Sequence, residues 1–126
     1  MDTDKVGIEP SVVAECAVDY WKLLKVCDRL MKELSEDRRK RIGAQVRFSA
    51  NRLESHLDAL GIELLTFEGL QFGPELPAIA VNANDFGIAE TLLVESAIEP
   101  AVIIHGKVVH NAQVMLKEGE INVSGN

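Results

Sequence analysis

The side chains best suited to acid–base or metal chemistry in this chain are three histidines, His56, His105 and His110. His105 and His110 stand on either side of an expected turn at an odd separation, so on an ideal strand they point to opposite faces. No cysteine lies near them in the sequence, and a zinc site would need two further ligands from scattered carboxylates. We therefore expect no metal site.

Other residues that could carry catalysis lack the context that catalysis requires. Asp85, Phe86 and Gly87 spell a kinase metal-binding tripeptide, but the chain has no glycine-rich loop, strand lysine or catalytic loop. No serine lies in a Gly-x-Ser-x-Gly elbow. The carboxylates of Glu95 and Glu99 are most simply explained as charges at a strand edge or in a loop. No motif supports a small enzyme or ligand-binding protein, and we expect a protein that is not an enzyme.

Composition and charge limit the class of protein further. Of 126 residues, 47% are hydrophobic and 26% charged, which is typical of a globular chain of one domain or two small modules. Residues 61–126 hold only Lys107 and Lys117 against nine acids, 2 − 9 = −7, which equals the net charge of the whole chain. Such an acidic surface repels phosphate backbones, so we expect no nucleic-acid partner.

The same sequence gives no reason to expect a membrane partner. No apolar run approaches the roughly 18 to 20 residues that span a bilayer, and the first residues lack the pattern of a signal peptide. We expect a cytoplasmic protein. Its two cysteines, Cys16 and Cys27, are expected to be buried structural thiols, because eleven residues along one helix, about 16 Å, exceed the reach of a disulfide.

Residues 1–60 have the periodicity of a helical hairpin. Apolar residues recur at steps of three and four along the first helix, and others seven apart widen this seam into a face. The seam consists of Val13, Cys16, Tyr20, Leu23, Cys27, Leu30 and Leu34, widened by Ala17, Leu24 and Met31. Ser35 and Asp37 predict a break and a new helix start. The basic run 38–41 is expected there as a solvated face, and Gly61 is expected to end the second helix.

A hairpin of this kind packs one apolar face within itself and leaves another uncovered. We expect two copies to cover it by forming a dimeric four-helix bundle. The alternative is that this face packs on residues 61–126. The expected dimer interface consists of Tyr20, Leu23, Leu24, Cys27, Leu30 and Met31.

Residues 61–126 change to the pattern of β-strands. Strands are predicted over 62–67, 78–83, 92–98, 101–104 and 107–116. His105 and Gly106 lie between two β-branched runs, as a hairpin turn would, and Pro100 marks an irregular connection. The predicted fold is α+β, with a helical hairpin over 1–60 and a small, mostly antiparallel β domain over 61–126.

Four stretches occur in an order and spacing shared with one known family. Residues 23–30 are similar to its Leu-Leu-Pro-Val-x-Asp-x-Leu segment, and residues 57–63 to its Leu-x-x-x-Gly-Val-Glu junction. Residues 72–78 are similar to its Phe/Leu-Asp-Pro-x-x-His-x-Ala motif, and residues 98–116 to its last β-hairpin. Over residues 20–116 the chain thus resembles the GrpE family, the nucleotide exchange factors of DnaK-type heat-shock chaperones.

The chain also differs from this family at identifiable positions. Gln45 stands where the family has a glycine, Gly73 where it has an aspartate, Pro77 where it has a histidine and His110 where it has an arginine. About ten residues of this sequence precede the first expected helix, where family members carry a long coiled coil.

The resemblance implies a homodimer whose β domain enters the nucleotide-binding cleft of a DnaK-type chaperone and promotes ADP release, with no cofactor. The factor would bind the open cleft more tightly than the closed one. The partner contacts that it implies are Phe72, Ile98, Lys107 and Leu116, with core packing as the alternative for the three apolar residues. The alternative function is a dimeric structural or adaptor protein with this fold and no exchange activity.

Overall fold

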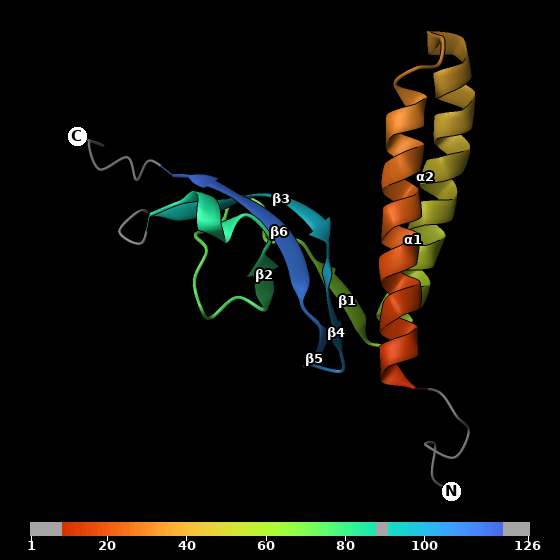
Figure 1. Cartoon of the computed structure of the whole chain (residues 1–126). Coiled ribbons are helices and arrows are strands. Elements are labelled where there is room, and N and C mark those ends of the chain that lie inside the picture. Colours follow the sequence, from red (N-terminus) through yellow and green to blue (C-terminus); the bar gives the residue numbers. More distant parts are fainter. Residues whose placement is uncertain (1–8, 88–90, 120–126) are drawn as a thin grey trace, which may run out of the picture.

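The computed structural model describes residues 9–87 and 91–119. Two antiparallel helices, α1 (Pro10–Met31) and α2 (Glu36–Ala59), form a long stem. The rest of the described chain forms a small β module beside the lower part of the stem, and the α1–α2 turn projects clear of it (Figure 1). The predicted α+β fold, with a helical hairpin followed by a mostly antiparallel β module, is confirmed.

Side-chain hydrogen bonds to the backbone stabilise the end of α1 and the start of α2. Ser35 caps α2 by accepting a hydrogen bond from the backbone amide of Arg38 at 3.4 Å. The guanidinium of Arg39 donates to the carbonyl oxygens of Met31 and Leu34, each at 3.1 Å, which satisfies groups left free where α1 ends. The basic run 38–41 therefore lies near the start of α2, as predicted.

Gly61 ends α2 and starts the β module. Its φ of 74° lies in the left-handed region that glycine tolerates best. A Cβ at this position would also lie 2.5 Å from the ring of His105. Position 61 thus requires glycine both for its backbone conformation and for the close approach of the histidine.

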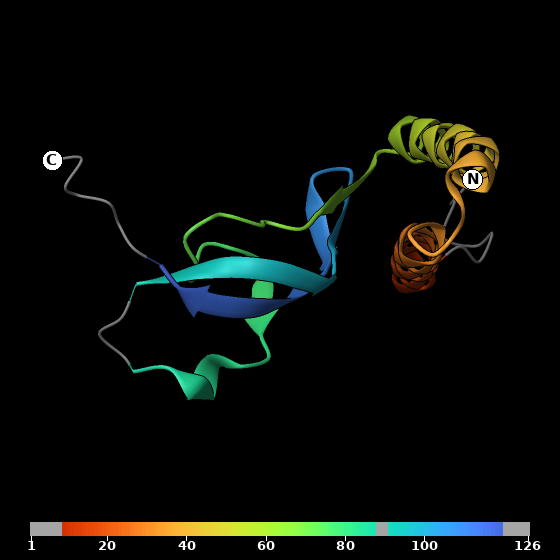
Figure 2. The same ribbon diagram turned by 90° about the horizontal axis from the view of Figure 1, so that it is seen from above.

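The strands form two three-stranded sheets. In the stem sheet, the order is β1 (Ile62–Leu65), β4 (Ala101–Ile104), β5 (Lys107–His110), all antiparallel. In the outer sheet, the order is β2 (Ala78–Ala80), β6 (Ala112–Glu118), β3 (Leu92–Glu99), with β2 parallel and β3 antiparallel to β6. A short 3₁₀ turn, η2 (Ala83–Asp85), follows β2. Figure 2 shows the stem sheet between the helices and the outer sheet.

The chain crosses between the two sheets at two single residues. Pro100 joins β3 of the outer sheet to β4 of the stem sheet, and Asn111 joins β5 of the stem sheet to β6 of the outer sheet. The single strand predicted over 107–116 is therefore wrong. It breaks at Asn111 because its two halves pair with partners in different sheets.

Each sheet has its own apolar core. The junction core joins α1 to the stem sheet through five buried residues, Ala14, Ala17, Val18, Ile62 and Val102. The outer core lies under the outer sheet and is built on Val94, Ala101, Ala112, Val114 and Leu116, with Phe67, Phe72, Leu76 and Phe86 packed around them. Two alanines in the junction core let the helix backbone approach the sheet closely.

Val102 is fully buried where helix and sheet meet, so we expect Val102→Ala to lower the free energy of unfolding by about 2 kcal/mol through lost burial and the cavity left behind. Val108→Ala is the control, because Val108 is 49% exposed and its truncation is expected to cost less than about 0.5 kcal/mol. Urea unfolding at one protein concentration compares them. Equal losses in the two variants would contradict this view of the junction.

Candidate partner-binding surfaces

An apolar groove runs along the stem between α1 and α2. Three hollows follow one another, and each shares lining residues with the next. The lowest and middle hollows share Tyr20 and Leu53, and the middle and upper hollows share Cys27 and Val46. The middle hollow has a volume of about 330 Å³. The groove follows the heptad seam of the sequence from the junction core towards the α1–α2 turn.

All six residues predicted at a dimer interface line this groove. Tyr20, Leu23, Leu24 and Cys27 line the middle hollow, and Cys27, Leu30 and Met31 line the upper one. Leu23 is 64% and Leu30 58% exposed in the single chain. The described residues of the two helices include only four buried ones, Ala14, Ala17, Val18 and Gly43. Helices in proteins depend on packing of their apolar face, and much of that face is uncovered in the single chain.

The groove is lined by one tyrosine and two cysteines as well as by aliphatic side chains. The hydroxyl of Tyr20 donates to the carbonyl oxygen of Ala50 at 3.5 Å, and burial, together with the carboxylate of Glu54, raises the pKa of Tyr20. The two cysteines, predicted to be buried, are not: Cys16 is exposed and Cys27 half-buried. That prediction was wrong because both thiols lie on the seam that a single chain leaves uncovered.

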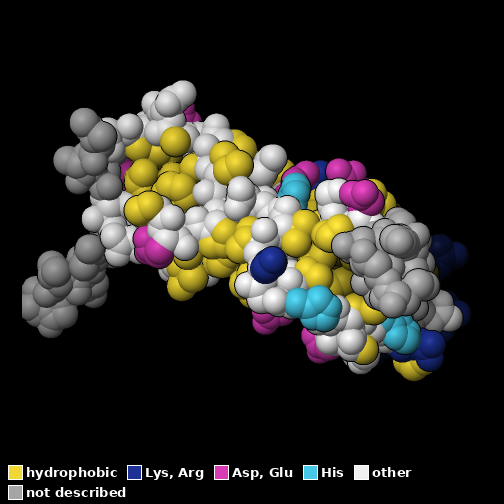
Figure 3. Space-filling view, turned by 90° about the horizontal axis from the view of Figure 1, so that it is seen from below, with side chains coloured by type: hydrophobic (Ala, Val, Ile, Leu, Met, Phe, Trp, Pro, Cys, Tyr) yellow, Lys and Arg dark blue, Asp and Glu magenta, His cyan; other side chains and the backbone are white. Residues whose placement is uncertain are grey.

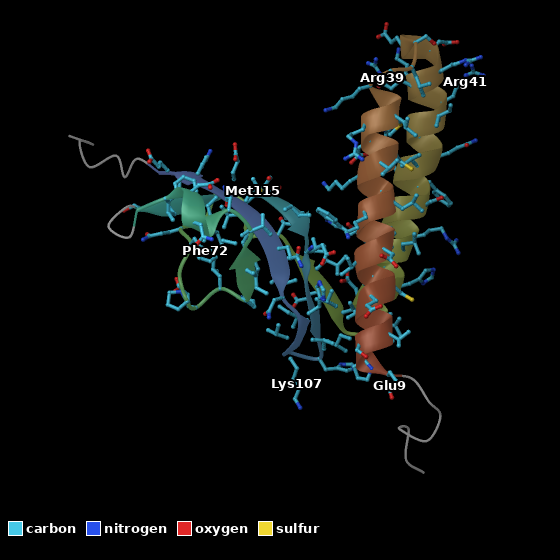
Figure 4. The ribbon with its side chains drawn as sticks, in the orientation of Figure 1. Glu9, Arg39, Arg41, Phe72, Lys107 and Met115 are labelled. Carbon is cyan, nitrogen blue, oxygen red and sulfur yellow. The ribbon has the colours of Figure 1, made fainter. Side chains whose placement is uncertain are left out.

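The β module presents one cation at the tip of a hairpin. His105 and Gly106 turn between β4 and β5 with positive φ values of 50° and 82°, the conformation that a two-residue hairpin turn with matched twist requires. Lys107 follows at once and is exposed. Figure 4 shows its side chain pointing away from the module. The turn predicted here is confirmed.

The three apolar partner contacts implied by the family resemblance have different environments. Leu116 is 2% exposed and belongs to the outer core, so its side chain offers no surface to a partner in this fold. Phe72 is half-buried and packs on the same core. Ile98 is 41% exposed, at a point of irregular pairing in β3. Core packing therefore explains Leu116, and Ile98 keeps an accessible surface.

The β module has other exposed apolar side chains. Leu70, Ile79 and Val81 are each at least half exposed. Figure 3 shows hydrophobic side chains gathered on the lower face of the module. An apolar surface of this kind is typical of a contact with another protein.

A charged cluster that the sequence did not predict lies where the stem meets both sheets. The ammonium of Lys22 on α1 lies 2.6 Å from Oε2 of Glu99, and Nε2 of His110 lies 2.8 Å from Oε1 of the same carboxylate. The hydrogen bond from Lys22, and after it that from His110, holds the pKa of Glu99 below its usual value. The bond to Glu99 raises the pKa of Lys22. Lys22 lies 77 positions from Glu99 in the chain, and His110 lies 11 positions from it. Because such separations leave no local pattern in the sequence, only the tertiary fold brings these residues together.

Within residues 9–87 and 91–119, no group of three or more histidine, cysteine, aspartate or glutamate side chains is placed to hold a metal ion. Neither described helix is long and apolar enough to cross a membrane. No family model, curated protein or solved structure matches this chain.

The low pKa of Glu99 in the folded chain predicts how its contribution to stability depends on pH. The contribution is fully present above the pKa of an unfolded glutamate, about 4.3, and is lost as pH falls through the lower folded value. We therefore expect the difference in unfolding free energy between the wild type and Glu99→Gln to persist from pH 7 down to about 5 and to shrink below about 4.

Urea unfolding at each pH measures this difference. Glu95→Gln is the matched control, because Glu95 is exposed on the same strand and forms no ion pair within the described residues. If the difference in unfolding free energy between the wild type and Glu99→Gln stayed unchanged down to pH 3, this would contradict the low pKa assigned to Glu99.

Proposed function

We propose that the chain is a homodimer in which the grooves of two stems close on each other as a four-helix bundle. Support comes from the groove itself, which is continuous, is lined by large aliphatic side chains and follows one heptad seam. A second copy offers the same face and can cover it symmetrically. Burying Leu23, which is 64% exposed in the single chain, contributes about 1 to 2 kcal/mol per copy.

We further propose that each dimer presents its β modules to a DnaK-type chaperone and promotes ADP release, as the resemblance to the GrpE family implies. The observation that carries this proposal is the position of Lys107, an exposed cation at a hairpin tip in a module that has a net negative charge. A cation that projects in this way can meet a carboxylate of a nucleotide-binding domain.

ADP release would follow from differential binding. The β module binds the open nucleotide cleft more tightly than the closed one, and this difference is all that a ligand can use to shift the equilibrium between the two states. Ile98 and the half-buried Phe72 would add apolar contact to the charge of Lys107. The stem would hold the module at a fixed position relative to its partner copy.

A second candidate is a dimeric structural or adaptor protein that has this fold without exchange activity. Two observations favour it. Leu116, one of the four implied partner contacts, is buried. His110, where the family has an arginine, faces Glu99 within the module. A surface that lacks the Leu116 side chain and has a histidine in place of the family's arginine fits a different partner.

Leu23→Glu is expected to break the dimer, because it places a charge in the middle of the apolar groove. Sedimentation equilibrium should give twice the chain mass of 13.8 kDa for the wild type and a single-chain mass for the variant. Phe48→Glu is the control. Phe48 is also 64% exposed but lines none of the three hollows, so its variant should remain dimeric. A monomeric wild type, or equal behaviour of the two variants, would overturn the bundle.

Release of fluorescent ADP from a DnaK-type chaperone tests the second part of the proposal. The wild type should accelerate release, and Lys107→Ala should lower that acceleration on the order of tenfold, the loss expected when one partner of a desolvated charge pair is removed. Lys117→Ala removes the other exposed cation of the module and should have little effect. A folded, dimeric wild type that leaves the release rate unchanged would favour the adaptor function instead.

A further inference from the structure

The two sheets of the β module are joined at two neighbouring crossovers, and an ionisable side chain lies directly before each. Glu99 is the last residue of β3, directly before the Pro100 crossover. His110 is the last residue of β5, directly before the Asn111 crossover. The 2.8 Å contact between their side chains therefore ties together the two points at which the chain passes from one sheet to the other.

The same carboxylate is also held from the stem. Lys22 lies one helical turn beyond Val18, which packs in the junction core, and its ammonium reaches the second oxygen of Glu99 at 2.6 Å. The Glu99 side chain is 17% exposed and that of His110 29% exposed, so water screens these contacts less than it would on an open surface. One carboxylate thus joins the stem, the stem sheet and the outer sheet.

The two sheets differ in how they are held to the stem. The stem sheet packs on α1 through the junction core, where Ile62 and Val102 are buried against the helix. The outer sheet has a core of its own, to which Ala101 of the stem sheet also contributes. Its strand β3 also contacts α1, and its strand β6 contacts β4. The contacts of Glu99 with Lys22 and His110 add to this packing at the crossovers and are placed to fix the orientation of the outer sheet.

We propose that Glu99 is a positioning residue that sets the angle between the outer sheet and the stem sheet. Lys107 belongs to the stem sheet, whereas Ile98 and Phe72 lie on and beside the outer sheet. The angle between the two sheets therefore sets the distance between the ammonium of Lys107 and the apolar side chains of Ile98 and Phe72. This inference rests on the proposed chaperone contact of these residues, and it adds that Glu99 favours binding by arranging them before the partner arrives.

Residual dipolar couplings of backbone amides, measured on the dimer, test the angle without any partner. In the wild type, amides of both sheets should fit a single alignment tensor. In Glu99→Gln, the stem sheet should keep its tensor, and the outer sheet should give a separate tensor of smaller amplitude. Glu95→Gln changes the same charge on the same strand without a partner among the described residues and should behave as the wild type does. A single unchanged tensor in Glu99→Gln would overturn the proposal.

Two further substitutions separate positioning from a general loss of folding. Lys22→Met removes a half-exposed ammonium from the helix surface and cannot open either core, so it should still split the tensors. His110→Gln keeps a side-chain donor for Glu99 and should preserve a single tensor, whereas His110→Ala should not. If His110→Ala and His110→Gln give the same result, the contact does not set the angle.

Chaperone affinity then links the angle to function. We expect Glu99→Gln to bind a nucleotide-free DnaK-type chaperone on the order of tenfold more weakly than the wild type, within the range of couplings carried by positioning residues, with Glu95→Gln unchanged. Split tensors with unchanged affinity would refute the functional part. If the wild type itself does not bind, the proposed function fails, while the couplings still decide the role of Glu99.

Discussion

The close packing of α1 on the stem sheet is the contact on which the rest of the molecule depends. It is made by small side chains, Ala14 and Ala17, with Val18 beside them, against Ile62 and Val102. Larger residues here would move the helix away from the sheet. The same helix face continues upward into the groove, since Ala17 contributes to the junction core and lines the lowest hollow. The junction therefore fixes where the stem begins, which face it leaves open and where the β module stands.

Two kinds of interaction then act at different places. Apolar packing is strong at the junction and in the outer core, but the described stem above the junction has few buried residues and leaves its apolar groove uncovered in the single chain. Charge adds to packing at the crossovers between the sheets, where Pro100 and Ala112 are buried, through the contacts of Lys22 and His110 with Glu99. The apolar groove on the stem and the exposed Lys107 on the β module are the features that support the proposed protein contacts.

The sequence predicted those parts of the molecule that local chemistry decides. The cap at Ser35, the glycine that ends α2 and the turn at His105 and Gly106 each follow from the preference of one or two residues for a backbone conformation, and all are present. The heptad seam predicted the apolar face that lines the groove, because the spacing of apolar residues along one helix is also a local property. The prediction of one strand over 107–116 failed because it depended on pairing between distant parts of the chain. The break at Asn111 is decided by which sheet each half of this segment joins.

The candidate site shows the same division. The exposure of Lys107 followed from its place after a turn, which is a local property. The burial of Leu116 and the cluster around Glu99 depend on where β3, β6 and α1 meet, and no spacing in the sequence encodes that meeting. The exposure of Cys16 was missed for a further reason, since an apolar seam in the sequence does not say whether one chain or two will cover it.

Hydrogen exchange of the protein with and without a nucleotide-free DnaK-type chaperone is the most direct measurement of whether the β module is the proposed binding surface. Slower exchange is expected in the β4–β5 hairpin around residues 105–110 and in the connection around residues 70–77. Amides in the middle of the stem, which would face the proposed bundle in both states, should not change. Protection confined to the stem, or none in the β module at saturating chaperone, would contradict chaperone binding through this module.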